Sequence, residues 1–162
     1  MPVRRFSTAY SAGFASGSSH NHPRLSSPMA SCVSIAGTVV NTLYVMDPLD
    51  QIDVSGDSTY MLMLEGCRRE GSVHWCTPAD LFAVGGRCHA RCAAVEVTQT
   101  DPFFHTREPT DVDLGWFDVV WLRKDPPFDI AYVFTTYMLD LVPRSTLVLN
   151  DPAAIRDANE KM

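Results

Sequence analysis

Three side chains, Arg123, Ser58 and Thr59, are of types that bind a carboxylate or phosphate group, and two aspartates lie close to them in the sequence. Arg123 directly follows an apolar run, so its backbone is held rigidly, and its guanidinium can donate two hydrogen bonds to one carboxylate. Ser58 and Thr59 stand at the predicted start of a helix, where hydroxyls and backbone N–H groups favour an anion. Asp47 and Asp125 are the neighbouring carboxylates. These residues predict a site for a small carboxylate.

Each of these residues also has an ordinary structural role open to it. Arg123 can pair with Asp47 or Asp125 and merely tie two loops together. Ser58 and Thr59 can serve as simple helix-capping groups. The sequence alone leaves both alternatives open.

The elements that must position these residues alternate between strand and helix patterns from residue 38 onward. Such alternation predicts an α/β fold, with an open, mainly parallel, Rossmann-like sheet, helices on both faces and one hairpin. Ligands of such sheets bind beyond the carboxyl ends of the strands, which is where the polar segments fall. The predicted order is strand 38–46, helix 57–70, strand 73–76, hairpin 81–97, loop 99–115, strand 117–122, helix 129–141, strand 146–149 and helix 151–162.

Apolar spacing predicts which face of each main helix is buried. Gly71 is expected at the left-handed C′ position that ends the first helix. The predicted inward stripe of the first helix is Tyr60, Met61, Leu64 and Cys67. The predicted inward stripe of the second is Ile130, Val133, Phe134, Tyr137, Met138 and Leu141.

The charge is distributed unevenly along the 162 residues. Residues 1–46 carry three arginines and no acidic residue, whereas the remainder has ten basic and nineteen acidic residues. Residues 1–37 also hold nine serines and few large aliphatics, so a disordered tail is expected there. Two interpretations of this tail stay open: an organelle-targeting peptide, or an extension preceding a true start at Met29.

Composition excludes several classes of protein. The net charge of −6 argues against a nucleic-acid binder, and no apolar run is long enough to span a membrane. Five irregularly spaced cysteines favour a reducing, cytoplasmic location over a disulfide framework. His74, Cys76, Cys88, His89 and Cys92 lack the paired spacing of a zinc site, so no metal is expected.

Several motifs occur in an order that resembles the N-terminal part of bacterial-type glutathione synthetase. The resemblance covers roughly residues 40–162, and its most specific part is Arg-Lys-Asp-Pro-Pro-Phe-Asp at 123–129. The other segments are Val-Met-Asp-Pro at 45–48, Asp-Ser-Thr at 57–59, Asn-Asp-Pro at 150–152 and Arg-Asp-Ala-Asn-Glu-Lys at 156–161. The tail has no counterpart in the family.

This resemblance implies a pre-ATP-grasp domain over residues 38–162, at the start of an ATP-grasp ligase. The family uses ATP and magnesium to activate the cysteinyl carboxylate of γ-glutamylcysteine as an acyl phosphate, which the amine of glycine attacks to give glutathione. The ATP-grasp domains that hold ATP and magnesium follow in the family and are not expected in this chain. The resemblance implies that the residues facing the dipeptide are Arg123, Asp125, Ser58, Thr59 and Asp47, with Arg123 on a substrate carboxylate and Asp125 orienting Arg123. It implies no catalytic, cofactor-binding or metal-binding residue in this chain.

The sequence therefore predicts a substrate-side domain of glutathione synthase that is inactive alone. Two other hypotheses stay open: a module that binds a small carboxylate without catalysis, and a structural domain that forms a homo-oligomer. A phosphorylated receiver domain shares the fold class, but only Asp47 and Lys124 match its acidic pocket and lysine.

Overall fold

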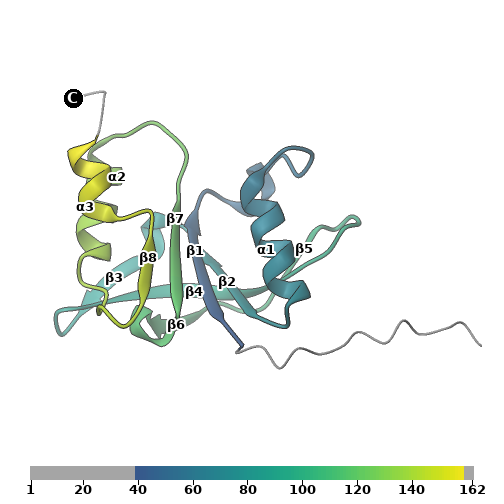
Figure 1. The fold of residues 1–162 in the computed structure, drawn as a ribbon, viewed down its shortest axis with the longest axis horizontal. Coiled ribbons are helices and arrows are strands. Elements are labelled where there is room, and N and C mark those ends of the chain that lie inside the picture. The colour runs from purple at the N-terminus through teal and green to yellow at the C-terminus, as the bar shows by residue number, and fades with distance from the viewer. Residues whose placement is uncertain (1–38, 159–162) are drawn as a thin grey trace, which may run out of the picture. The chain divides into compact units, whose positions relative to one another are not determined.

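The computed structural model describes residues 39–158. The predicted tail and the last residues of the predicted C-terminal helix lie outside this range. Within it, eight strands form one sheet, in the order β3-β4-β2-β1-β7-β8, with β5 and β6 each paired to β4 (Figure 1). The strands are β1 Asn41–Met46, β2 Ser72–Cys76, β3 Leu81–Val84, β4 Arg87–Val97, β5 Phe104–Thr106, β6 Thr110–Asp113, β7 Val119–Arg123 and β8 Leu147–Leu149. The helices are α1 Ser58–Arg68, α2 Ile130–Leu139 and α3 Pro152–Asp157.

The predicted α/β class with a parallel sheet is confirmed. The strands β2, β1, β7 and β8 run parallel to one another, and the antiparallel strands extend the sheet beyond β2. The sheet continues through the predicted hairpin of β3 and β4, whose turn is formed by Gly85 and Gly86 at φ values of 56° and 78°.

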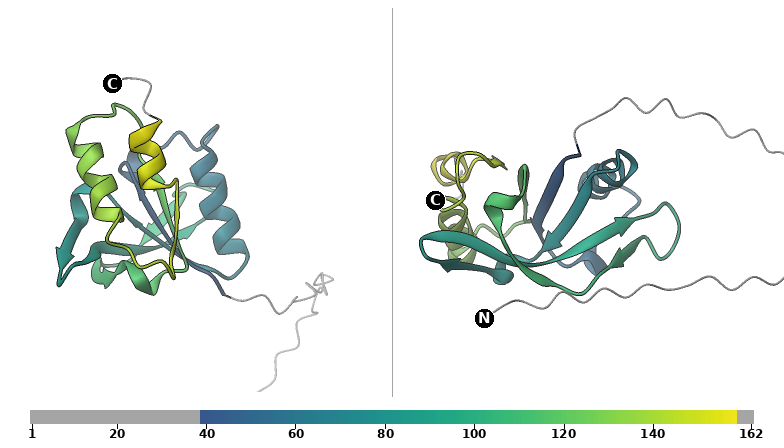
Figure 2. Two further views of the ribbon diagram at one scale, coloured as in Figure 1. Left: turned by 60° about the vertical axis from the view of Figure 1, so that its left-hand side comes forward. Right: turned by 90° about the horizontal axis from the view of Figure 1, so that it is seen from below.

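Helices cover both faces of the central strands, as predicted, because side chains alternate between two hydrophobic clusters along β1. Leu43 and Val45 join the cluster beneath α2 and α3, whereas Tyr44 and Met46 join the cluster beneath α1. Figure 2 shows α1 on one side of the sheet and the α2–α3 pair on the other.

Residues 99–115, predicted to form a loop, contain β5, β6 and a 3-10 turn at Leu114–Trp116. That prediction was wrong because these short polar strands depend on β4, whose eleven residues pair at different points with four other strands. Long-range pairing of this kind leaves no periodic apolar signal in the strand itself.

The predicted inward stripe of α1 was wrong at Met61, which is exposed, while Met63 is fully buried beside Tyr60. The error on α2 is larger. Ile130, Phe134, Tyr137 and Leu141 face outward, and the buried residues are Thr135, Thr136 and Leu139.

The two buried threonines of α2 are accommodated because their hydroxyls bond within the helix. Thr135 Oγ1 donates to the Ala131 carbonyl at 2.9 Å and Thr136 Oγ1 to the Val133 carbonyl at 2.6 Å. With these hydroxyls satisfied, α2 can bury either of its faces. The spacing of its apolar residues does not decide which face is buried. The final helix, predicted to reach Met162, ends at Asp157, with Ala158 as its C-cap.

The core contains three buried cysteines, Cys76, Cys88 and Cys92, which are free thiols, as is the half-buried Cys67. Burial raises the pKa of Cys88 to about 12 and that of Cys92 to about 11, and it raises the pKa of Cys76 well above the usual value. These thiols are consequently neutral packing groups.

The C-terminus of α1 forms a Schellman motif. The Gly71 N–H donates to the Gly66 carbonyl and the Glu70 N–H to the Cys67 carbonyl, each at 3.0 Å. The left-handed residue is Glu70, with φ of 59°, so the prediction of Gly71 at C′ was wrong by one position. Gly71 is needed instead for close approach, because a Cβ there would lie 2.9 Å from the Gly66 carbonyl oxygen.

We predict that Glu70→Gly raises the free energy of unfolding by about 0.5–1 kcal/mol, because glycine adopts a positive φ without steric cost. Urea denaturation measures this. The matched variant Gly71→Ala should lower the same free energy by about 1–3 kcal/mol through crowding. A destabilised Glu70→Gly variant would contradict this assignment of the strained position.

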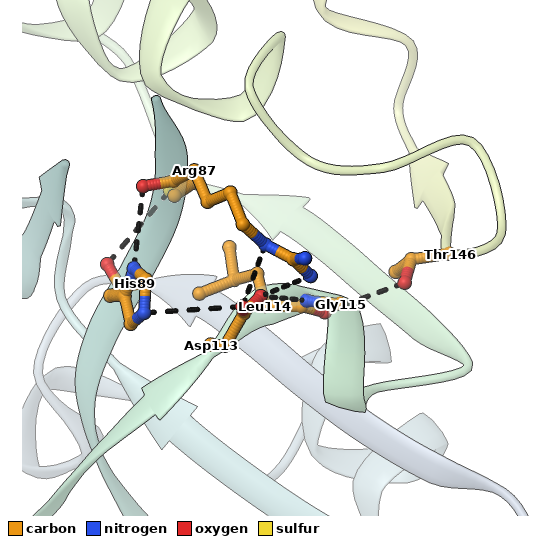
Figure 3. Close-up of polar contacts among 7 residues, drawn as sticks. Arg87, His89, Asp113, Leu114, Gly115 and Thr146 are labelled. Atoms are coloured by element: carbon orange, nitrogen blue, oxygen red, sulfur yellow. Dashed lines mark hydrogen bonds and ion pairs between the residues drawn. The ribbon is translucent and has the colours of Figure 1, made fainter. Parts of the chain in front are cut away.

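A cluster of polar contacts links the β3–β4 hairpin to the turn before β7 (Figure 3). Arg87 Nε lies 2.8 Å from Asp113 Oδ2, and Asp113 Oδ1 accepts the Gly115 N–H at 2.8 Å. Thr146 Oγ1 donates to the carbonyls of Leu114, at 3.4 Å, and Phe117, at 2.8 Å. The Gly115 N–H and then Arg87 hold the pKa of Asp113 below its usual value.

A lowered carboxyl pKa stabilises the fold above the pKa of the unfolded state, and this stability is lost as the pH falls through the folded pKa. We therefore predict that Asp113→Asn lowers the Tm at neutral pH and that its Tm converges on that of the unmodified chain below about pH 4. Thermal unfolding across this pH range measures the gap. Asp111→Asn, whose ion pair with Arg91 is 3.6 Å long and exposed, is the control with a smaller gap. A gap independent of pH would refute the role of Asp113.

Candidate functional site

A polar pocket of about 300 Å³ lies at the carboxyl ends of β1 and β7. The chain leaves β1 toward β2 on one side, whereas β7 and β8 lie on the other, so the strand order reverses between β1 and β7. This reversal is the topological switch point, the usual ligand site of an open α/β sheet. Its lining residues are Met46, Asp47, Pro48, Gln51, Ile52, Asp57, Thr59, Arg123, Lys124, Asp125 and Pro126.

Arg123 is the last residue of β7 and lies beside Met46 in the parallel register. Its Nε donates to Thr59 Oγ1 at 3.1 Å, and one terminal nitrogen donates to Ser58 Oγ at 2.7 Å. Among residues 39–158, no carboxylate forms an ion pair with this guanidinium. Arg123 therefore presents a positive charge whose position is fixed by neutral hydroxyls.

Ser58 and Thr59 are the first two residues of α1. Asp57 is the N-cap, and its Oδ1 accepts the backbone N–H groups of Thr59, at 2.5 Å, and Tyr60, at 3.2 Å. The two hydroxyls consequently do not cap the helix, which was their alternative role, and instead face Arg123.

Asp47 joins the ends of β1 and β7. Its Oδ1 lies 2.8 Å from Lys124 Nζ, and its Oδ2 accepts the Asp125 N–H at 3.0 Å. The alternative in which Arg123 pairs with Asp47 or Asp125 is thus wrong, because Asp47 forms its ion pair with Lys124 and no ion pair joins Arg123 to Asp125. The prediction that Asp125 orients Arg123 was also wrong, because Ser58 and Thr59 accept the guanidinium's hydrogen bonds.

The structure brings all five predicted site residues to one place, but sequence reasoning omitted Lys124 from the site. The position of Lys124 in the sequence could have indicated its role, because it follows β7 directly, just as Asp47 follows the neighbouring β1. Beneath the pocket, Tyr44 stacks on Trp121 with ring centroids 6.0 Å apart, and burial raises the pKa of Tyr44 to about 12, so this phenol stays neutral.

The pocket is suited to an anion rather than to a metal ion. Arg123, Lys124 and the hydroxyls are hydrogen-bond donors, while Asp47 and Asp57 already accept hydrogen bonds from the chain. No group of three histidine, cysteine or acidic side chains in the described range is arranged to hold a metal. No helix in this range is long and apolar enough to cross a membrane.

Comparison with known proteins places this geometry in a family. Residues 40–156 match the family model described as "Prokaryotic glutathione synthetase, N-terminal domain". The chain belongs to this family. The resemblance found in the sequence is thereby confirmed.

Similar proteins carry the name glutathione synthetase. The chain is 41% identical to that of Rhodopseudomonas palustris over 118 residues. This matched region is 72% of this chain and 38% of the relative. It is 40% identical over 124 residues to that of Bradyrhizobium diazoefficiens, covering 76% and 40%. It is 44% identical over 122 residues to that of Parasynechococcus marenigrum, covering 74% and 38%. The chain thus spans about two fifths of the length of these curated relatives.

The geometry makes Asp47 the link between the two central strands. We predict that Asp47→Ala lowers the free energy of unfolding by about 1–3 kcal/mol, because two hydrogen bonds to a charged, partly buried group are lost. Asp47→Asn keeps an acceptor for the Asp125 N–H and should lose less. Chemical denaturation of both variants measures the difference, and equal stability of all three chains would contradict the role given to Asp47.

Proposed function

We propose that this chain is the substrate-side domain of glutathione synthase and binds the dipeptide γ-glutamylcysteine through a carboxylate. The observation that carries the proposal is Arg123, a guanidinium fixed by two hydroxyls at the switch point and without an ion-pair partner in the described range. A guanidinium so placed has the charge and planarity to hold a carboxylate by two hydrogen bonds.

Ser58 and Thr59 support this function by limiting the rotamers of Arg123. Lys124, which is paired with Asp47, is a second cation in the pocket lining. Within the proposal, Asp47 and Asp125 shape the pocket. Asp47 holds the Lys124–Asp125 turn, which lies next to Arg123.

We further propose that residues 38–162 form the family's pre-ATP-grasp domain and do not make glutathione by themselves. The donors in the pocket suit a carboxylate, and Asp47 and Asp57 accept hydrogen bonds from the chain, so we assign ATP, magnesium and glycine to other parts of the complete family enzyme. The free thiols in the described range support a reducing, cytoplasmic location.

We predict that the intact chain binds γ-glutamylcysteine in titration calorimetry and that Arg123→Ala weakens binding by about 10–100-fold, as expected for a lost charged hydrogen-bond pair. Arg123→Lys should fall between the two, because lysine keeps the charge but not the fork. Arg91→Ala, which makes the same change of charge on β4 outside the pocket lining, is the control.

Failure of the intact chain to bind the dipeptide, or binding unaffected by Arg123→Ala, would refute the substrate site. Release of ADP by the purified chain, supplied with ATP, magnesium, the dipeptide and glycine, would refute the separate proposal that it is inactive alone. The two results are independent, so each part of the proposal can fail by itself.

A further inference from the structure

The pocket lining holds two side chains of opposite charge that form no ion pair in the described range. Arg123 is the cation, and Asp125, two residues further along the chain, is the anion. The backbone of Asp125 is fixed, because its N–H donates to Asp47 Oδ2 at 3.0 Å and its carbonyl accepts from Lys124 Nζ at 3.0 Å. Its carboxylate is exposed and has no hydrogen bond or ion pair among residues 39–158.

The other charged residues of the lining are compensated within the chain. Asp47 is paired with Lys124, and the two atoms lie 2.8 Å apart. Asp57 is the N-cap of α1, and its Oδ1 accepts the N–H groups of Thr59 and Tyr60, so the positive end of the helix balances its charge. The pocket therefore presents one uncompensated positive group and one uncompensated negative group to a ligand.

Arg123 and Asp125 do not neutralise each other because the guanidinium is turned toward α1. Its Nε donates to Thr59 Oγ1 and one terminal nitrogen donates to Ser58 Oγ. The end of the guanidinium, formed by its two terminal nitrogens, keeps donors for a carboxylate. Both charges thus remain available at the same pocket.

A free α-amino-acid group is the ligand that matches such a pair. It carries a carboxylate and an ammonium on one carbon atom, so its two charges are as close together as the pocket requires. The ammonium has three donors and no acceptor, which suits the free carboxylate of Asp125. A ligand with a carboxylate alone would be attracted by Arg123 but repelled by Asp125.

γ-Glutamylcysteine has one such group. Its two carboxylates differ, because the γ-glutamyl carboxylate shares its carbon with an ammonium, whereas the cysteinyl carboxylate lies beside an amide nitrogen. The cysteinyl carboxylate is also the one that the family's reaction converts, so a site that holds the γ-glutamyl end leaves it free to react.

We propose that the pocket binds the α-amino-acid group of the γ-glutamyl residue, with its carboxylate on Arg123 and its ammonium on Asp125. This inference rests on the proposed function. It adds which end of the dipeptide is held, and it makes Asp125 a residue that determines specificity.

Two analogues of the dipeptide test which groups are recognised. α-Glutamylcysteine has the same atoms and the same net charge, but its free glutamyl carboxylate lies at the end of the side chain, away from the ammonium. N-Glutarylcysteine lacks the ammonium. In titration calorimetry with the full 162-residue chain, we expect the γ-linked dipeptide to bind at least about tenfold more tightly than either analogue.

The variant Asp125→Asn tests the residue itself. It should weaken binding of the γ-linked dipeptide about 3–10-fold, because an exposed charge pair is lost. Binding of N-glutarylcysteine should stay equal or become tighter, because a repulsion is removed. Asp50→Asn, which makes the same change of charge at an exposed aspartate outside the pocket lining, should leave the ratio of the two affinities unchanged. Thermal unfolding checks that both variants fold.

Equal binding of the γ-linked and α-linked dipeptides would overturn this inference. An Asp125→Asn variant that weakens the dipeptide and N-glutarylcysteine equally, or weakens neither, would overturn it as well. In these cases the proposed function stands if binding of the γ-linked dipeptide still depends on Arg123. No binding of that dipeptide by the intact chain would instead refute the proposed function and this inference with it.

Discussion

The parallel pairing of β1 with β7 is the constraint on which the rest of the structure depends. The two strands are more than 70 residues apart in the chain, yet residues 42–46 align with residues 119–123. An aspartate secures each end of the pair. Asp118 accepts the Asn41 N–H at 2.8 Å where the strands begin, and Asp47 holds Lys124 and the Asp125 N–H where they end. The cores on both faces of the sheet and the pocket at its edge are built on this pair.

The same pairing decides the electrostatics of the pocket. Because Arg123 ends β7 next to the end of β1, its guanidinium reaches the first turn of α1, which follows β1 in the chain. Asp47 forms its ion pair with Lys124, so Arg123 has no ion-pair partner among the described residues. The two adjacent basic residues therefore differ in their contacts. Lys124 pairs with Asp47 at the end of β1, whereas Arg123 reaches the first turn of α1.

The sequence predicted those features that depend on local signals. The predicted helical segments begin at Asp57, Asp129 and Asp151, and each of these aspartates caps its helix, because the cap and the helical pattern that follows it lie within one turn of the chain. The pocket segments were also brought together correctly, since the carboxyl ends of parallel strands share one edge. What failed depends on partners far along the chain: β5 and β6 exist through β4, and the buried face of α2 is chosen by the sheet beneath it.

The buried cysteines have a consequence for chemistry in a cell. A thiol whose pKa is about 12 holds about one thiolate in 10⁵ molecules at pH 7, and the thiolate is the reactive form in disulfide exchange. Cys76, Cys88 and Cys92 are therefore protected twice, by their low ionisation and by their lack of contact with solvent. The core of this domain should stay reduced and unmodified across wide swings in the ratio of glutathione to its disulfide.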